Sequence, residues 1–429
     1  MITEQLTSQT GRSPVPREAE GQRSTTSGFW IASAMLFLLI AQSGVPSPLY
    51  PIYQQELDLT PAATTAVLSV YICGLLLSLP TVGALSDHVG RRPVIVASAV
   101  VSVAALALFA SADSLTALLI ARALQGIAVG AGMGAAGAAM IDHAPPGSAR
   151  LAAVLNGALP PAGLAAGALG SGVLAQNAPA PTVTIYLVCA VLISTVAVLA
   201  LRLREHRKRA PVTWSTLAPR VAVPREVRRI FAVVIGCMIS SWALAGLYLG
   251  MGPTILSKSL GVTSHIAAGF AIALVTGTGA LTGVLGRRRD AWDIMLIGAA
   301  ALIIGPALTV SALAAHSPWG FYASAPVAGI GFGAAFQGGL RMLLAGAPSE
   351  GRAGLLSAVY LISYTAFGLP AVVAGMLVPA LGLVPVVEGY AAFVVLVSAV
   401  ALALQRLIGG RRRGEEIVAD AAGAAEELA

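Results

Sequence analysis

Twelve apolar stretches of about 20 residues follow one another along the chain, and they restrict its fold more than any other feature. At a rise of 1.5 Å per residue, a helix of that length crosses a hydrocarbon core roughly 30 Å thick. Inside lipid a helix satisfies all of its own backbone hydrogen bonds. The sequence therefore predicts an all-α integral membrane protein. The spans are placed near residues 29–50, 61–86, 93–111, 115–141, 149–175, 182–203, 229–256, 264–286, 291–314, 318–344, 353–380 and 384–407.

The composition excludes several other classes of protein. Hydrophobic residues make up 57% of the chain and charged residues only 10%, against about a quarter in soluble domains, which rules out an ordinary water-soluble enzyme. Cys73, Cys189 and Cys237 lie inside apolar runs and offer neither a disulfide framework nor a metal pattern. The five His are scattered and no GxxxxGK[ST] phosphate loop occurs. We therefore expect no enzyme activity, no metal and no cofactor. Any work that such a membrane protein performs is expected to draw on an ion gradient, and a proton gradient is the first candidate.

The few charges predict the orientation in the membrane. Apart from Arg122 and Lys258, every Lys and Arg falls on one side of the twelve spans if the N-terminus is on that side. Positive charge collects on the cytoplasmic side of membrane proteins, so both termini are expected in the cytoplasm of a cell-membrane protein. This placement accounts for the net charge of +7 without nucleic acid as a partner. The basic residues in 202–229 are also suited to anionic lipid headgroups.

An internal repeat divides the chain into two halves. GALSDHVGRR at 83–92 and GALTGVLGRR at 279–288 share six of ten positions at an offset of 196 residues. A second match, between 126–131 and 329–334, is shifted by 203 residues. Duplication of a six-helix unit explains both offsets. The predicted segments are a disordered cytoplasmic tail at 1–28, six-helix bundles at 29–203 and 229–408, a basic cytoplasmic linker at 204–228 and a cytoplasmic tail at 409–429.

At these motifs the chain resembles the major facilitator superfamily, and within it the bacterial drug and metabolite exporters. The loop after span two resembles the superfamily signature GxLxDRxGRR, and span four resembles its RxxQGxxxG pattern. The resemblance covers roughly residues 29–408 and implies two pseudo-symmetric bundles that expose a central site to each side of the membrane in turn. The matching residues named as candidates are Gly83, Asp87, Gly90, Arg91, Arg92, Arg122, Gln125 and Asp142.

Two interpretations of the first motif remain open. The resemblance implies that Asp87 latches the inner gate against the start of span eleven, near 351–354, and that Arg91 and Asp142 form a charge relay. Alternatively, Arg91 and Arg92 only set the topology and Asp87 is their exposed counterion. In the second copy Gly283 replaces the acid, so the two halves are predicted to be asymmetric.

Arg122 lies about eight residues into span four, where an arginine costs about 2.5–3.5 kcal/mol on insertion scales. Either it faces the central cavity with Gln125 and binds a carboxylate or an anionic substrate, or it holds carbonyl groups of a neighbouring helix. No Asp or Glu lies deep in a span. Proton coupling would therefore use the acids near the span ends, His88, His143 or the charge of the substrate itself.

In the superfamily, spans one, four, seven and ten line the cavity, with two, five, eight and eleven beside them. The lining residues predicted on that basis are Gln42, Tyr71, Met133, Asn156, Trp242, Tyr248, Phe336, Gln337, Tyr360 and Tyr364. Aromatic rings with a few amides are suited to a medium-sized amphipathic organic molecule.

The leading functional hypothesis is a monomeric secondary active transporter that exports such compounds, drugs or metabolites, in exchange for protons. An importer or anion exchanger for a small organic anion is the alternative. A membrane enzyme or a transport-dead sensor has less support, because no cluster of catalytic residue types occurs in the sequence.

Overall fold

The computed structural model describes residues 17–205, 221–348 and 351–427. These parts of the chain are helical and contain no strand. The first half consists of α1 (Arg17–Gly44), α2 (Tyr50–Glu56), α3 (Pro61–Val89), α4 (Arg91–Ala110), α5 (Leu115–Asp142), α6 (Ala149–Asn177) and α7 (Pro181–Ala200). The second half consists of α9 (Arg228–Thr254), α10 (His265–Leu285), α11 (Ala291–Ala314), α12 (Pro318–Gly346), α13 (Arg352–Leu381) and α14 (Leu383–Glu427).

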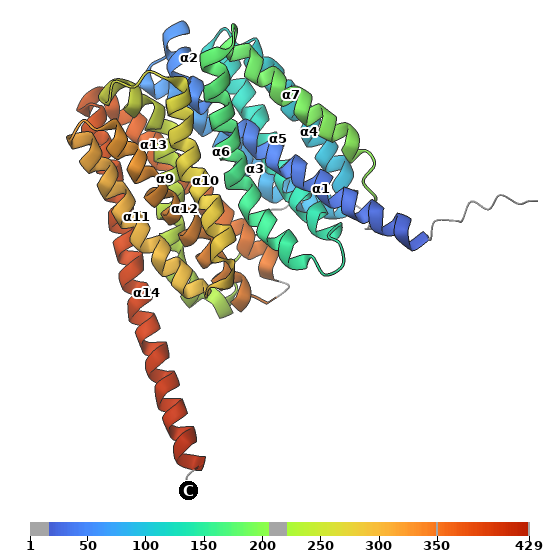
Figure 1. Ribbon diagram of the computed structural model, residues 1–429, viewed down its shortest axis with the longest axis vertical. Coiled ribbons are helices and arrows are strands. Elements are labelled where there is room, and N and C mark those ends of the chain that lie inside the picture. The colour runs from blue at the N-terminus through green and yellow to red at the C-terminus, as the bar shows by residue number, and fades with distance from the viewer. Residues whose placement is uncertain (1–16, 206–220, 349–350, 428–429) are drawn as a thin grey trace, which may run out of the picture.

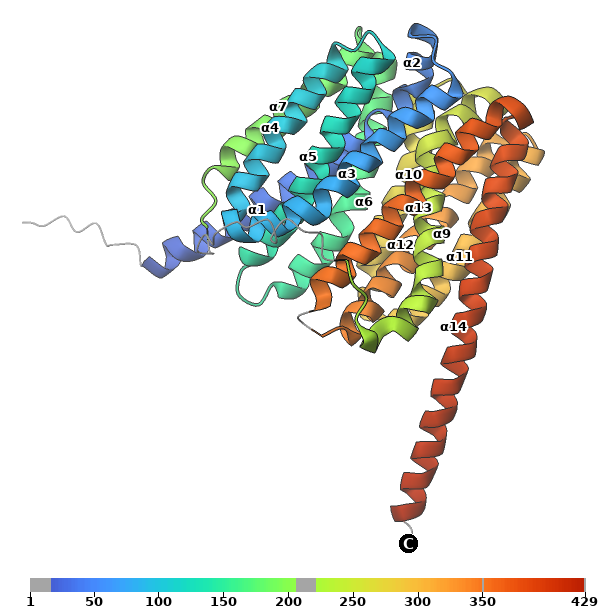
Figure 2. The ribbon, with the colours of Figure 1, turned by 180° about the vertical axis from the view of Figure 1, so that it is seen from behind.

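Twelve segments of the described chain are long and apolar enough to cross a membrane, which confirms the predicted all-α fold and number of spans. The two halves form separate bundles that lie side by side, blue to green and yellow to red in Figures 1 and 2. We call the end of the bundles from which α1 starts and α14 projects the terminal end, and the other the opposite end.

Helix starts follow the capping residues in the sequence. Thr60 accepts a hydrogen bond from the Ala63 N–H at 3.2 Å, and Ser317 accepts one from the Gly320 N–H at 3.1 Å. Each of these residues precedes a proline at the first helical position, where the missing N–H removes no helical hydrogen bond. Both helices begin where the predicted spans 61–86 and 318–344 begin.

The first and last helices extend beyond the predicted spans. Helix α1 begins at Arg17 and so includes residues 17–28 of the predicted N-terminal tail, and α14 continues through the predicted C-terminal tail to Glu427. Neither extension contains a proline, and adding residues to an existing helix is favourable once it has formed. Residues 1–16 of the predicted N-terminal tail and 206–220 of the predicted linker lie outside the described residues.

The two halves meet closely toward the opposite end, where α6 packs on α10 and α3 packs on α13. Two glycines make the α6–α10 contact possible: a methyl group at Gly172 would overlap the His265 carbonyl, and one at Gly269 would overlap the Ala168 carbonyl. Small residues allow helix backbones to approach in this way. The Gln176 side-chain oxygen accepts hydrogen bonds across the same contact, from the Ser264 hydroxyl at 2.6 Å and the Ile266 N–H at 3.2 Å. The molecule is therefore closed at this end.

Candidate functional site

A cavity of about 620 Å³ lies between the halves. Its deepest lining residues include Ser43 and Ser47, which are buried, whereas Arg150, Arg287 and Arg341 line it at the terminal end and are exposed. The cavity thus reaches the surface at the terminal end, away from the α6–α10 contact. Its volume is within the usual range for pockets that enclose a drug-sized molecule.

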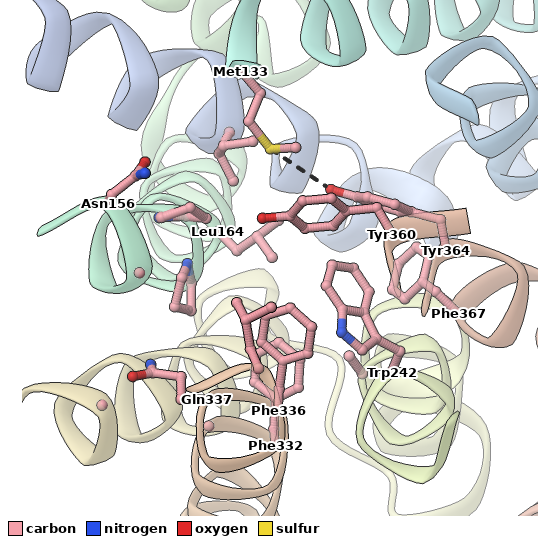
Figure 3. Close-up of a pocket in the computed structure, with 18 of the residues that line it drawn as sticks. Met133, Asn156, Leu164, Trp242, Phe332, Phe336, Gln337, Tyr360, Tyr364 and Phe367 are labelled. Atoms are coloured by element: carbon pink, nitrogen blue, oxygen red, sulfur yellow. Dashed lines mark hydrogen bonds between the residues drawn. The ribbon is translucent and has the colours of Figure 1, made fainter. Parts of the chain in front are cut away.

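The second half contributes an aromatic wall to this cavity, from α9, α12 and α13 (Figure 3). The ring of Trp242 lies 4.6 Å from that of Tyr364 and 5.4 Å from that of Phe336, measured between centroids. Tyr360 extends the wall, 6.4 Å from Tyr364. Rings at these separations and tilts stabilise one another, and together they present a surface on which a flat molecule can stack.

The facing wall comes from α5 and α6 of the first half and is mainly aliphatic. Met133, Pro160 and Leu164 line it, with the amide of Asn156 as its polar group. The two walls touch at one point, where the Tyr364 hydroxyl donates to the Met133 sulfur over 3.9 Å (Figure 3). A substrate between the walls would contact aromatic rings on one side and aliphatic groups on the other.

Polar groups in the cavity are few. The charged lining residues are Arg150, Arg287 and Arg341, and the described lining includes no Asp, Glu or His. The indole nitrogen of Trp242 is buried, and no acceptor for it occurs within the described chain. A buried donor without a partner is costly, so a shift of the indole that brought this N–H to a substrate oxygen would gain affinity.

The predicted lining residues are only partly brought together. Those that line the cavity are Tyr71, Met133, Asn156, Trp242, Phe336, Gln337, Tyr360 and Tyr364. Gln42 and Tyr248 do not line it. Each turns into its own half, where the Gln42 amide donates to Ser102 at 2.7 Å and the Tyr248 hydroxyl lies 2.8 Å from that of Thr309. Gln42 thus joins two helices of the first bundle, and Tyr248 joins two helices of the second.

Arg122 also lies outside the cavity lining, and its side chain is completely buried. Its guanidinium donates to the Gln125 side-chain oxygen at 2.7 Å, to the Tyr50 hydroxyl at 2.6 Å and to the Ser43 carbonyl at 3.3 Å. The ring of Tyr71 separates it from the cavity, with its centroid 5.4 Å from the guanidinium carbon. Gln125 is held in turn by the Gln42 carbonyl at 3.0 Å.

This arrangement agrees with the second interpretation of Arg122. The guanidinium has hydroxyl, amide and carbonyl partners, and no described carboxylate forms an ion pair with it. Aromatic faces around the charge partly replace water. In this conformation Arg122 joins α1 and α5 inside the first half and contacts no substrate space.

At the terminal end the first motif forms a charge cluster within the first half. The Arg91 Nε lies 3.3 Å from an Asp142 carboxylate oxygen, and its Nη1 donates to Ser86 at 2.7 Å. The pair is the one that the resemblance implies. Gly83 and Asp87 are in α3, but their side chains lie outside the described residues, so the latch from Asp87 stays a prediction.

A carboxylate that the sequence reasoning missed completes this cluster. Glu205 accepts the backbone N–H groups of Arg91 at 3.1 Å and Arg92 at 2.7 Å, which are the first residues of α4. Gly90 has a φ of +111°, and a methyl group there would lie 2.7 Å from a Glu205 oxygen. Negative charge is favourable at a helix start. The sequence offered one signal for this contact, since Glu205 is the single acid within the basic run 202–209.

Glu205→Ala is expected to lower the free energy of unfolding by about 1 kcal/mol, the usual cost of losing a helix cap. Glu226→Ala is the matched control, because it removes an exposed glutamate from the first turn of another helical segment, Arg225–Val227. Thermal unfolding of the purified variants in detergent measures the difference. Equal unfolding temperatures would contradict a stabilising role for Glu205.

The second copy of the motif, at 279–288, contributes to the cavity and not to a charge cluster among the described residues. Gly283, at the position of the missing acid, lines the cavity, and a side chain there would overlap the amide of Gln337. The lost carboxylate thus makes room for an amide at the terminal half of the cavity. The asymmetry expected from the sequence has a structural reason.

Comparison with known proteins assigns the chain to a family. Residues 32–371 match the Major Facilitator Superfamily. The chain belongs to this superfamily. It is accordingly a multi-pass membrane transporter and not an enzyme. No curated protein matches its sequence.

Solved structures support the same fold. A mutant form of nucleoside transporter NupG superposes with a TM-score of 0.69, at 15% identity over 88% of this chain and 99% of that one. Nucleoside transporter NupG itself gives a TM-score of 0.65 at 15% identity, over 88% and 98% of the two chains. At this identity the likeness extends to the fold of this superfamily member and not to its substrate.

Proposed function

We propose that this transporter exports a medium-sized aromatic organic compound by alternating access, in exchange for protons. The observation that carries the proposal is the cavity, which is closed at the opposite end, open at the terminal end and walled on one side by aromatic rings. The distribution of Lys and Arg assigns the terminal end to the cytoplasm. The described conformation is then the one that loads substrate from the cell.

Proton coupling has to act outside the described cavity wall, since no Asp, Glu or His lines it. Asp142 is the carboxylate of the motif cluster that the structure describes, and its partner Arg91 lies in the same half. Opening of this ion pair would free the terminal end to rearrange. We propose that this cluster, together with Asp87, couples the proton to the gate.

An anion exchanger or importer is the second candidate, and a specific observation favours it. The charged residues described in the cavity lining are all arginines, which attract an anion and repel a cationic drug. The two structural relatives are named as nucleoside transporters, and a nucleoside also combines a flat ring with polar groups. Such a molecule is suited to the aromatic wall.

Transport into everted membrane vesicles separates these functions. A panel of fluorescent aromatic compounds, neutral, anionic and cationic, is offered outside the vesicles with and without an acid interior. Proton-coupled export predicts accumulation that requires the pH gradient and disappears with a proton uncoupler. Accumulation that instead requires an anion inside the vesicles would favour anion exchange over proton-coupled export. No accumulation of any compound would refute both hypotheses.

Trp242 gives a test of the aromatic wall. Trp242→Ala is expected to weaken substrate affinity by about 10-fold to 100-fold, because stacking and one hydrogen-bond donor are lost together. Trp242→Phe keeps the ring without the N–H and should lose about tenfold or less. The KM for the compound accumulated above measures both changes. The matched control is Trp319→Ala, which changes an exposed tryptophan outside the cavity lining.

A further inference from the structure

A second hollow, of about 390 Å³, lies at the mouth of the cavity and is lined by both halves. The first half contributes Ser148, Arg150 and neighbouring residues of the first turn of α6. The second half contributes Arg287 and Arg288, from the short turn that follows α10. Three arginines from the two halves therefore face one space.

These arginines lack the carboxylates that balance the first copy of the motif. In the first half Asp142 pairs with Arg91, and Glu205 caps the helix that begins there. In the second copy Gly283 stands in place of Asp87, and Ala345 stands 203 residues after Asp142, at the offset of the second repeat. The described residues place no carboxylate within ion-pair distance of Arg150, Arg287 or Arg288.

The first turn of α6 adds to this positive field. Ser148 precedes the helix but makes no side-chain capping bond to it, since its hydroxyl donates to the Pro145 carbonyl at 2.6 Å. The N–H groups of a first turn have no acceptor inside their own helix, and the helix dipole favours an anion there. The hollow thus combines guanidinium groups with a helix start, which are the two protein features that bind phosphate and carboxylate groups.

Alternating access gives this hollow a mechanical consequence. The halves already touch at the opposite end, so rocking toward the other state brings the terminal ends of α6 and α10 together. That motion moves Arg150 against Arg287 and Arg288, and like charges oppose it where the described residues place no carboxylate between them. An anion between them would convert the repulsion into attraction.

We propose that this hollow is an anion site, and that an oxyanion bound to Arg150, Arg287 and Arg288 is required for the terminal gate to close. The ligand is a phosphate-type or carboxylate-type group, supplied from the water, as a free anion or part of the substrate, or by a lipid headgroup. The inference rests on the alternating access of the proposed function but not on the direction of transport or the coupling ion.

The test uses the full-length protein with the three native cysteines replaced and spin labels at Pro146→Cys and Leu285→Cys, exposed positions on either side of the mouth. Distances between the labels are measured by pulsed electron paramagnetic resonance in phosphatidylcholine nanodiscs while inorganic phosphate is titrated. Phosphate is expected to increase the population at short distance. The variant that combines Arg150→Gln with Arg287→Gln lacks both the repulsion and the anion site, so its label distances should no longer depend on phosphate.

Two further variants make the result specific. Arg150→Glu provides a carboxylate of its own, so its gate should close without phosphate, which a merely structural arginine would not predict. Arg289→Gln removes a neighbouring charge that does not line the hollow and should respond like the parent protein. Nanodiscs that contain phosphatidylglycerol distinguish the sources: if the parent protein closes there without phosphate, and the Arg150→Gln and Arg287→Gln variant does not respond to this lipid, the anion is a headgroup.

The proposal is overturned if phosphate and phosphatidylglycerol both leave the distances of the parent protein unchanged, if Arg289→Gln loses the response to phosphate, or if Arg150→Glu stays open without phosphate. Because no substrate is present, a failure of the vesicle assay to show transport would not alter this outcome. A normal response to phosphate in a protein that transports nothing would retain the anion site and refute only the proposed export.

Discussion

Gly172→Leu is expected to abolish transport, whereas Gly170→Leu, two residues away on α6, should transport nearly normally. Gly172 lies against the backbone of α10, with the Ile266 Cα only 3.2 Å from where a Cβ would be, whereas nothing lies within 4 Å of a Cβ at Gly170. Backbone atoms cannot move aside as a flexible side chain can, and overpacking of this kind costs about 1–3 kcal/mol. The closed population at the opposite end should fall about 10-fold to 100-fold.

Transport in proteoliposomes and label distances at the opposite end measure this prediction together. For Gly172→Leu we expect no measurable transport together with a longer label distance between α6 and α10. Normal transport in Gly172→Leu would show that the close α6–α10 contact is not needed in the cycle. A folding defect would instead appear as aggregation in detergent, which the Gly170→Leu variant controls for on the same helix.

Arg122→Ala is expected to lower the free energy of unfolding by about 3 kcal/mol, because it leaves Gln125 and Tyr50 without their buried donor and opens a hole at the centre of the first half. Arg122→Lys keeps the charge, but an ammonium lacks the fork that reaches both partners. The free energy of unfolding of Arg122→Lys should therefore lie between those of the parent protein and Arg122→Ala.

Denaturant unfolding in detergent, combined with substrate affinity of the folded fraction, checks this prediction. Tyr248→Phe is the matched control in the second half, where it removes one hydroxyl from the network with Thr309 and Ser324 and should cost about 1 kcal/mol. If Arg122→Ala unfolds like the parent protein and loses substrate affinity instead, Arg122 is a binding residue and the structural interpretation is wrong.

The sequence predicted depth in the membrane better than it predicted which side of a helix faces the cavity. Twelve spans and several helix starts could be read from hydropathy and capping residues because each depends on local chemistry. Membrane helices are apolar all round, so no polar stripe marks the side that faces the cavity. For this reason Tyr71 and Tyr364 line the cavity while Gln42, Tyr248 and Arg122, at equally suitable depths, turn into their own bundles.

The charge cluster at the terminal end shows a second limit of sequence reasoning. Arg91 and Asp142 could be paired through the resemblance, since both belong to motifs of the superfamily. Glu205 belongs to no motif, and its partners are backbone N–H groups 113 and 114 residues away. A contact of that kind depends on how the chain returns after α7, which only the folded structure shows.

The unequal walls of the cavity also determine how cargo travels. The rings of Trp242, Phe336, Tyr360 and Tyr364 all belong to the second half and pack against one another. When the halves separate, a stacked molecule retains its largest contact area with that half and leaves the aliphatic surface of Met133 and Leu164 first. The second half would then hold the substrate throughout the cycle, and movement of the first half would expose the substrate to each side of the membrane.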